Sequence, residues 1–240
     1  MSIPPRRTRR PRGSLTRPRV VEAALRLADE EGLEALTMPG LARRLDCGVM
    51  TIYGYVDSRD DLLDAIAAAG LANLRLPRPL PAEPAAVLVL WGRALRETLI
   101  EHPCLPVIFL ARAVIGQAIF RGIEALLAAL GRAGMPAAVG VRAIYAVVIY
   151  TTGFAAWEQP RTVRQPASDY AMAWRREFAS LPADDYPLTS GVLDELARVA
   201  GAEQFELGLA ALASGLAGRA PGLGDAPGGT RDGGRSTSTE

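Results

Sequence analysis

The sequence contains no lysine, one histidine, one asparagine and two cysteines among its 240 residues. The two cysteines, Cys47 and Cys104, are too few for a disulfide framework, and with His102 they lack the spacing of a zinc site. We therefore expect no metal and no cofactor, and we expect both thiols to behave as small buried hydrophobes in a cytoplasmic protein. No apolar run follows the arginine-rich first residues, so we expect no signal peptide.

The usual parts of a catalytic site are missing too. The sequence has no Gly-rich phosphate loop and no evident Ser-His or Cys-His arrangement. His102 precedes Pro103, which is more typical of a residue at a helix end than of a general base. We therefore expect that the protein is not an enzyme. Among other classes of protein, an enzyme is the main alternative.

The charge is distributed unevenly along the chain. Residues 1–19 contain seven arginines and no acid, whereas residues 20–240 contain 20 arginines and 26 acids, a charge of −6. A basic segment joined to an acidic body is typical of a protein that grips an anionic polymer at one end. The simpler alternative is a disordered tail without a partner. Because all 27 basic residues are arginine, arginine content alone does not indicate phosphate recognition.

The pattern of apolar residues predicts an all-α protein. Residues 1–17 and 220–240 lack periodic apolar spacing, and we expect both segments to be disordered. Between them we find no alternating strand pattern bounded by hairpin turns. Four prolines within residues 77–84 mark a boundary. We therefore predict an N-terminal domain over 18–76 and a C-terminal domain over 77–219.

The N-terminal domain is predicted to hold helices near 18–31, 38–45, 49–56 and 60–74. Gly32 ends the first helix, and Thr37 is a suitable N-cap for the second. The two short helices are joined by a tight turn at Asp46, Cys47 and Gly48. Two short helices joined in this way, with supporting helices on either side, are the layout of a helix-turn-helix. The second of them would enter a DNA major groove.

The outward face of the 49–56 helix is predicted to contact DNA. Gly48, Val49, Met50 and Thr51 would face base edges, offering apolar contacts and a hydroxyl but no arginine for guanine. Tyr53 and Tyr55 would touch phosphates, which positions a protein without specifying sequence. The alternative is that both tyrosines only cover the core of their own domain.

The segment from residue 36 to residue 66, LTMPGLARRLDCGVMTIYGYVDSRDDLLDAI, resembles the N-terminal signature of the TetR family of repressors. The resemblance covers residues 18–70 and implies phosphate contacts by Thr37, Tyr53, Tyr55 and Arg59. Pro39, Gly40 and Gly54 depart from the usual pattern, so the arginine-rich arm is expected to add contacts in the minor groove. The predicted DNA-binding residues are Thr37, Arg44, Gly48, Val49, Met50, Thr51, Tyr53, Tyr55, Arg59, Arg10, Arg12 and Arg17.

The C-terminal domain is similar to the tetracycline-repressor-like class of that family. We expect helices near 84–101, 105–115, 117–133, 136–158, 169–180, 189–200 and 202–218, with loops at 160–167 and 181–188. Members of the family dimerise through a four-helix bundle, and the resemblance assigns that role to the helices at 137–158 and 202–216. The predicted interface residues are Val148, Thr152, Phe205, Leu209, Leu212 and Leu216. A homodimer would place two recognition helices on a near-palindromic operator in double-stranded DNA.

The apolar stretch at 137–157 also permits a different interpretation. Its 21 residues are long enough for a membrane span and contain one charge, Arg142. However, Gly140, Gly153 and two threonines interrupt it, and no basic cluster flanks it closely. We expect no membrane association.

A ligand cavity is expected inside the C-terminal domain. The predicted ligand-binding residues are Trp91, Phe109, Arg112, Gln117, Phe120, Tyr145, Ile149 and Trp157, and the alternative for each aromatic residue is an ordinary place in the core. Phe109 and Arg112 stand where the resemblance would place the histidine and threonine that help to hold a metal-chelated drug. We therefore expect a bulky hydrophobic organic molecule without a metal.

The whole sequence is best interpreted as a ligand-responsive DNA-binding repressor. Ligand would release the protein from DNA, with the helix at 60–74 as the lever between the two domains. A helical module that only binds other proteins is a third alternative, but it would leave the arginine-rich arm and the exposed tyrosines unexplained.

Overall fold

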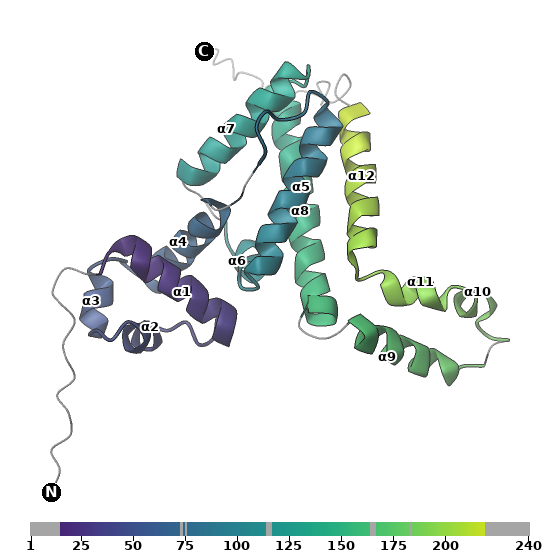
Figure 1. The fold of residues 1–240 in the computed structure, drawn as a ribbon, viewed down its shortest axis with the longest axis horizontal. Helices are drawn as coiled ribbons and strands as arrows, with labels where there is room; N and C mark the ends of the chain where they lie inside the picture. Colours follow the sequence, from purple (N-terminus) through teal and green to yellow (C-terminus); the bar gives the residue numbers. More distant parts are fainter. Residues whose placement is uncertain are drawn as a thin grey trace, which may run out of the picture.

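The computed structural model describes residues 15–218, except residues 73, 75, 114–116, 164–166 and 183. Within these residues the chain forms helices and no strand, so the all-α prediction is confirmed. Figure 1 shows three parts: a small head of α1 to α4, a bundle of longer helices, and an arm of α9 to α11 that projects from the bundle. Of the two segments predicted to be disordered, 1–17 and 220–240, residues 1–14 and 220–240 lie outside the described residues.

The head begins earlier than predicted. Helix α1 spans Arg17–Glu31, because the Thr16 side chain caps it by accepting a hydrogen bond from the Arg19 amide at 3.5 Å. Residues 15–17 are therefore ordered, and the prediction of disorder up to residue 17 was wrong at its last three positions. Gly32 ends the helix as expected, with φ of 87°, a conformation that glycine adopts at little cost.

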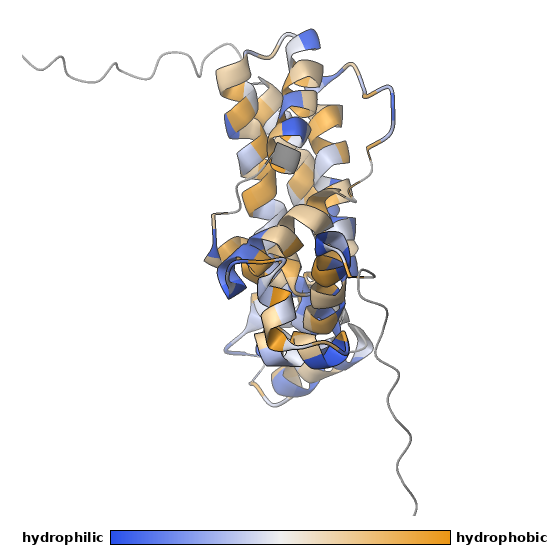
Figure 2. Cartoon of the chain, turned by 90° about the vertical axis from the view of Figure 1, so that its left-hand side faces the viewer, coloured by the Kyte–Doolittle hydropathy of each residue, from blue (hydrophilic) through white to orange (hydrophobic). Residues whose placement is uncertain are grey.

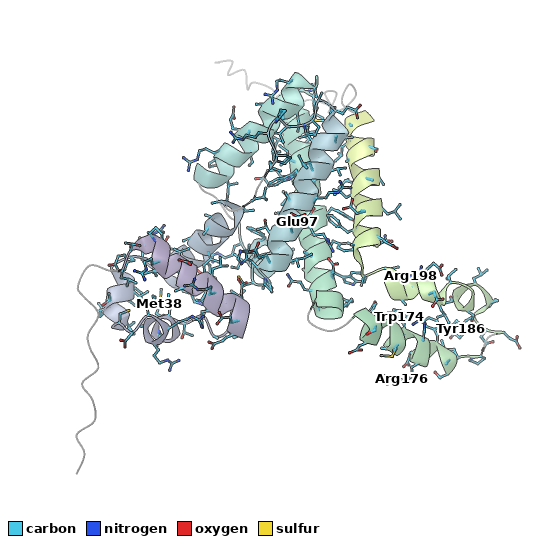
Figure 3. The ribbon with its side chains drawn as sticks, viewed as in Figure 1. Met38, Glu97, Trp174, Arg176, Tyr186 and Arg198 are labelled. Carbon is cyan, nitrogen blue, oxygen red and sulfur yellow. The ribbon has the colours of Figure 1, made fainter. Side chains whose placement is uncertain are left out.

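The helix-turn-helix is formed by α2, Met38–Arg44, and α3, Val49–Tyr53. Helix α3 is shorter than the predicted 49–56. After Gly54 the amides of Tyr55 and Val56 both donate to the Ile52 carbonyl, which closes the helix in a tight turn. Ile52 and Val56 are buried in the core of the head, which also contains residues of α1, α2 and α4. In Figure 3 Met38 marks the start of α2 within the head.

Helix α4, Arg59–Ala72, connects the head to the rest of the molecule. It packs on α1 within the head, and on α5, α6 and α7 outside it. The core of the head does not end at α4, since the same buried cluster includes Leu99 of α5 and Leu105 and Ile108 of α6. A movement of α4 must therefore be accompanied by repacking on both sides.

The bundle consists of α5, Pro84–Glu101, α7, Gln117–Arg132, α8, Ala137–Glu158, and α12, Ala202–Gly218. Short helix α6, Leu105–Ala111, fills the space between α4 and α8. Gly92 lets α5 approach α12 closely, because a Cβ atom there would lie 2.6 Å from the Leu209 side chain. Near the C-terminal ends of α5 and α8, Arg96 of α5 forms a largely buried ion pair with Glu158 of α8.

The arm consists of α9, Ala167–Ala179, α10, Pro187–Ser190, and α11, Leu193–Arg198. The single helix predicted at 189–200 is thus two short helices, and the loop predicted at 160–167 includes a π-helical turn, Gln159–Val163. Arg175 of α9 pairs with Asp194 of α11 at 2.6 Å, and this contact lowers the pKa of the Asp194 carboxyl. Figure 3 shows Trp174, Tyr186 and Arg198 on this arm.

Helix α8 and the turn after it, Ala137–Arg161, form a helix apolar and long enough to cross a membrane. In this fold the helix packs between α5, α7 and α12, with 39% of its most apolar window buried. Figure 2 shows that apolar residues also extend along the neighbouring helices of the bundle. Packing within the bundle accounts for the apolar residues on the buried face of this helix.

Candidate DNA-binding surface and ligand cavity

Helix α3 presents a small exposed surface at the edge of the head. Met50 is 80% exposed and Tyr53 is 45% exposed, and Gly48 and Thr51 are exposed beside them. Val49 differs, because it is only half-exposed and packs against the core of the head. The structure thus brings four of the predicted DNA-binding residues together on one face.

Tyr55 has another environment. Its hydroxyl donates to the Leu15 carbonyl at 2.9 Å, and its ring packs against the core of the head. The Tyr55 carbonyl also accepts from Arg17 at 3.1 Å. Tyr55 thus holds the start of α1 through two hydrogen bonds. This geometry supports the alternative for Tyr55, a residue that covers its own domain.

The predicted DNA-binding arginines that the structure describes also have partners within the chain. Arg59 donates to the carbonyls of Leu36 and Leu33, both at 3.1 Å, and so orders the connection before α2. Arg44 pairs with Glu30 at 2.6 Å, and Arg17 pairs with Asp61 at 2.8 Å. A guanidinium has five donors, so each retains donors for a phosphate.

Three of the predicted DNA-binding residues remain: Thr37, Arg10 and Arg12. The Thr37 hydroxyl accepts from the Gly40 amide at 3.0 Å and thereby caps α2, as predicted. Arg10 and Arg12 lie outside the described residues.

A cavity of about 990 Å³ lies where α4, α5, α6, α7 and α8 meet. Most of its lining is aliphatic or aromatic, and the polar exceptions are three arginines, one tyrosine and one threonine. The lining residues are Leu71, Ala72, Leu74, Leu76, Pro77, Arg78, Leu80, Trp91, Leu95, Phe109, Arg112, Ala113, Ile119, Arg121, Gly122, Ile123, Ala125, Ile144, Tyr145, Val148 and Thr152. This is the size and character of a site for an organic molecule.

Half of the predicted ligand-binding residues line this cavity: Trp91, Phe109, Arg112 and Tyr145. Three others do not line it. Phe120 is 60% exposed, Ile149 is 70% exposed, and Trp157 lies under the Arg161 guanidinium. The side chain of Gln117 lies outside the described part of the chain. Arg78 and Arg121 were not predicted, although an arginine at the edge of an apolar stretch is a signal that could have indicated them.

The predicted dimer interface also needs correction. Phe205 and Leu209 are fully buried within the protomer, against α5 and α8, and cannot form a surface between subunits. Leu212 and Leu216 are half-buried against the same core, and Val148 and Thr152 line the cavity. The assignment of these two helices to a dimer interface stays a prediction, but Phe205 and Leu209 face the core of their own protomer.

A different set of apolar residues is exposed on these helices. Val141, Tyr145, Ile149 and Trp157 recur every four or eight residues on α8, and Leu207 is 66% exposed on α12. We call this set the α8–α12 stripe. A row of large exposed side chains at helical spacing is typical of a protein interface.

Two groups of polar contacts join the head to the larger domain. Arg112, just after α6, donates to Asp64 at 3.1 Å and to Asp60 at 2.8 Å, both on α4, and the bond to Asp64 raises the pKa of the guanidinium. On the other side of the head, Asp29 of α1 contacts His102 Nδ1 at 2.8 Å and accepts from the Cys104 amide at 3.2 Å.

His102 therefore stands at the C-terminal end of α5, as its proline neighbour indicated, and binds a carboxylate of the head. Burial raises the pKa of the Cys104 thiol, so this cysteine is a poor nucleophile. Among the described residues no three side chains of the metal-binding types gather in one place.

Comparison with known proteins gives matches to both parts of the chain. Residues 20–66 match the family model described as bacterial regulatory proteins, tetR family, and residues 80–219 match the model described as tetracyclin repressor-like, C-terminal domain. Among curated relatives, the HTH-type transcriptional repressor DrrR1 of Streptomyces coeruleorubidus is 33% identical over 195 residues, which cover 78% of this chain and 69% of that protein.

Solved structures give the same result. The Streptomyces coelicolor TetR family protein ActR in complex with actinorhodin has a TM-score of 0.77 at 28% identity, covering 88% of this chain and 99% of that one. The structure of BioQ with its double-stranded DNA operator has a TM-score of 0.58 at 26% identity, covering 85% and 99%. From the matched models, the relatives and the fold, this chain belongs to the TetR family of bacterial transcriptional regulators.

Proposed function

We propose that this protein is a ligand-responsive DNA-binding transcriptional repressor that a small, largely hydrophobic molecule releases from its operator. One observation carries the proposal. The chain has an exposed helix α3 and a cavity of about 990 Å³, and helix α4 runs from the head that contains α3 to the cavity. DrrR1 is named a transcriptional repressor, BioQ was solved with its operator and ActR with a small molecule, which supports each part of the proposal.

The DNA-reading surface comprises Gly48, Met50, Thr51 and Tyr53, with Thr37 and the three partnered arginines beside it. Val49 and Tyr55 support this surface from below, since both pack on the core of the head. The basic segment that contains Arg10 and Arg12 would add phosphate contacts. Residues 18–76 act as the head and residues 77–219 as the sensor, although their packing is continuous through α4.

The active form is a homodimer in the cytoplasm, without catalytic activity. The α8–α12 stripe is the surface that a second copy would cover, because its side chains are large, apolar and exposed. Two heads held at a fixed spacing would engage successive major grooves, so the operator would be a near-palindrome. Tethering the two heads also raises their effective concentration at the two half-sites.

Release follows from unequal binding to two conformations. A ligand in the cavity contacts α4 through Leu71 and Ala72, and α6 through Phe109. If it fits better when α4 is displaced, the heads lose the spacing that the operator requires. By reciprocity, operator DNA must then weaken ligand binding by the same factor.

The decisive experiment is selection of bound fragments from the source genome, followed by mobility-shift titration of the selected DNA. We expect an enriched sequence with two inverted half-sites, bound by two chains. The Tyr53→Phe variant should bind it more weakly. Purified protein that enriches no sequence, and binds no duplex at low salt, would contradict the proposed function.

A further inference from the structure

The side chains around the cavity offer hydrogen-bond donors in excess. Arg78, Arg112 and Arg121 are cations with donors only, and Tyr145 and Thr152 have hydroxyls that can donate or accept. Among the described lining residues there is no aspartate, glutamate, asparagine or glutamine. Such a lining favours a ligand that carries acceptors and negative charge, and it disfavours an amine.

Two buried polar atoms in this lining have no hydrogen-bond partner among the described residues. They are Nε1 of Trp91 and Oγ1 of Thr152, and Thr152 is only 4% exposed. The indole N–H can only donate. A buried donor without an acceptor costs free energy, and a ligand oxygen would recover that cost only if it displaced the side chains that now cover the indole N–H. In the same lining Leu95, Phe109 and Ile144 provide apolar surface for a flat ring system.

Arg112 differs from the other two arginines because it is bound to the head. Its Nε and Nη2 donate to Asp64 at 3.1 and 3.5 Å, and its Nη1 donates to Asp60 at 2.8 Å. All three nitrogens therefore have a carboxylate partner, and only two of the five N–H donors of this cavity-lining residue are unused. The three side chains together carry one positive and two negative charges. An anion that joins them meets two carboxylates of the same sign, so it binds Arg112 best when those carboxylates move away.

We propose that the cavity takes an aromatic acid whose anionic group binds Arg112 in place of Asp60 and Asp64 of α4. The proposal rests on the proposed function and adds the chemical class of the ligand. It also identifies how binding reaches the head, because the exchange removes a polar contact between the end of α6 and α4. Arg121 and Arg78 lie at the same cavity without a carboxylate partner among the described residues, and they help to neutralise the acid.

The exchange costs little free energy, because the two carboxylates that lose Arg112 are exposed to water. Side chains of Asp60 and Asp64 are 68% and 41% exposed, so water solvates both carboxylates once Arg112 leaves them. Ion pairs at such exposed positions contribute little to stability. An anion inside the apolar cavity, in contrast, depends on the guanidinium for its charge compensation.

The test uses two fluorescent probes with the same skeleton. 8-Anilinonaphthalene-1-sulfonate carries an anionic group, whereas N-phenyl-1-naphthylamine is neutral. In titrations of the full-length protein we expect the anionic probe to bind at least about tenfold more tightly, as charge-assisted hydrogen bonds do. Arg112→Gln should remove about that tenfold preference and leave the neutral probe unchanged. Arg132→Gln, at the end of α7 and outside the cavity, is the matched control.

Further variants test whether the probe binds inside the cavity and whether the anion replaces the two carboxylates at Arg112. Val148→Phe, which narrows the cavity, should weaken both probes, and circular dichroism would confirm its fold. Asp64→Asn should increase the affinity for the anionic probe only, because it removes a competitor for Arg112. An unchanged affinity in Asp64→Asn and in Asp60→Asn would mean that the anion binds beside the carboxylates, and the exchange would be wrong.

Two outcomes separate this proposal from the proposed function. If the two probes bind with equal affinity, or if Arg112→Gln has no effect, the ligand is not an acid. The proposed function would still stand if the unliganded protein binds the selected DNA. Loss of all specific DNA binding by that unliganded protein would instead count against the repressor itself. The probes need no DNA, so the two results are independent.

Discussion

Tyr53 and Tyr55 stand two residues apart at the end of α3, but their hydroxyl groups have different surroundings. Tyr53 is 45% exposed, whereas the Tyr55 hydroxyl donates to the Leu15 carbonyl. Tyr53→Phe should therefore lower DNA affinity by about 0.5–1.5 kcal/mol, the net value of one hydrogen bond, with an unchanged Tm. Mobility-shift titration and thermal unfolding of the same sample measure both quantities.

Tyr55→Phe should have the opposite pattern. It removes the bond that holds the residue before α1, so the free energy of unfolding should fall by about 1 kcal/mol. DNA affinity should change less than in Tyr53→Phe. A stable Tyr55→Phe protein with weakened DNA binding would show that its hydroxyl contacts phosphate after all.

Gly70 tests how closely α4 approaches α6. A Cβ atom at this position would lie 2.5 Å from Cδ1 of the buried Leu105. Gly70→Ala should thus destabilise the fold by about 1–3 kcal/mol through overpacking, measured by urea denaturation. Gly131→Ala is the control, since a Cβ there meets nothing within 4 Å. It should stabilise the protein by up to about 1 kcal/mol, and similar losses in both variants would refute the close approach.

At the scale of the element, α8 has two apolar faces with different roles. One face carries Val147 and Ile144 into the bundle, and the other carries Val141 and Ile149 outward. If a second copy covers the outward face, Ile149→Glu should give monomers, because burial of a carboxylate in an apolar interface is costly. Size-exclusion chromatography with light scattering measures the mass directly.

A matched variant controls for general loss of apolar surface. Leu188→Glu on α10 removes an 85% exposed leucine that lies off the α8–α12 stripe. It should leave the mass of a dimer unchanged. A dimer that persists in Ile149→Glu would require an interface elsewhere, for example on the arm.

At the scale of the whole molecule, charge asymmetry predicts a salt effect. Residues 1–14 contain five of the seven arginines that precede residue 20, and Thr16 would still cap α1 without them. Deletion of residues 1–14 should reduce the slope of log Kd against log salt by about 0.9 for each phosphate that the shortened chain no longer neutralises. Titrations at several salt concentrations measure this slope, and an identical slope in the two proteins would mean that the segment does not contact DNA.

The order of helices, the helix-turn-helix and the apolar character of α8 and α12 follow from the sequence alone. Each depends on neighbours along the chain: Thr37 caps α2, Gly32 ends α1, and apolar residues at helical spacing require burial. The motif around Ile52 was sufficient to indicate a DNA-reading head, because its core residues lie within one short segment.

Only the tertiary structure decided which face of each helix meets which neighbour. Periodicity shows that α8 and α12 are apolar, but an almost uniformly apolar helix has no sequence signal for direction, so Leu209 and Ile149 were assigned to the wrong sides. The contact of Arg112 with Asp60 and Asp64 joins residues 48 and 52 positions apart. Such a contact exists only because α6 packs on α4, and long-range packing is not encoded in any local pattern.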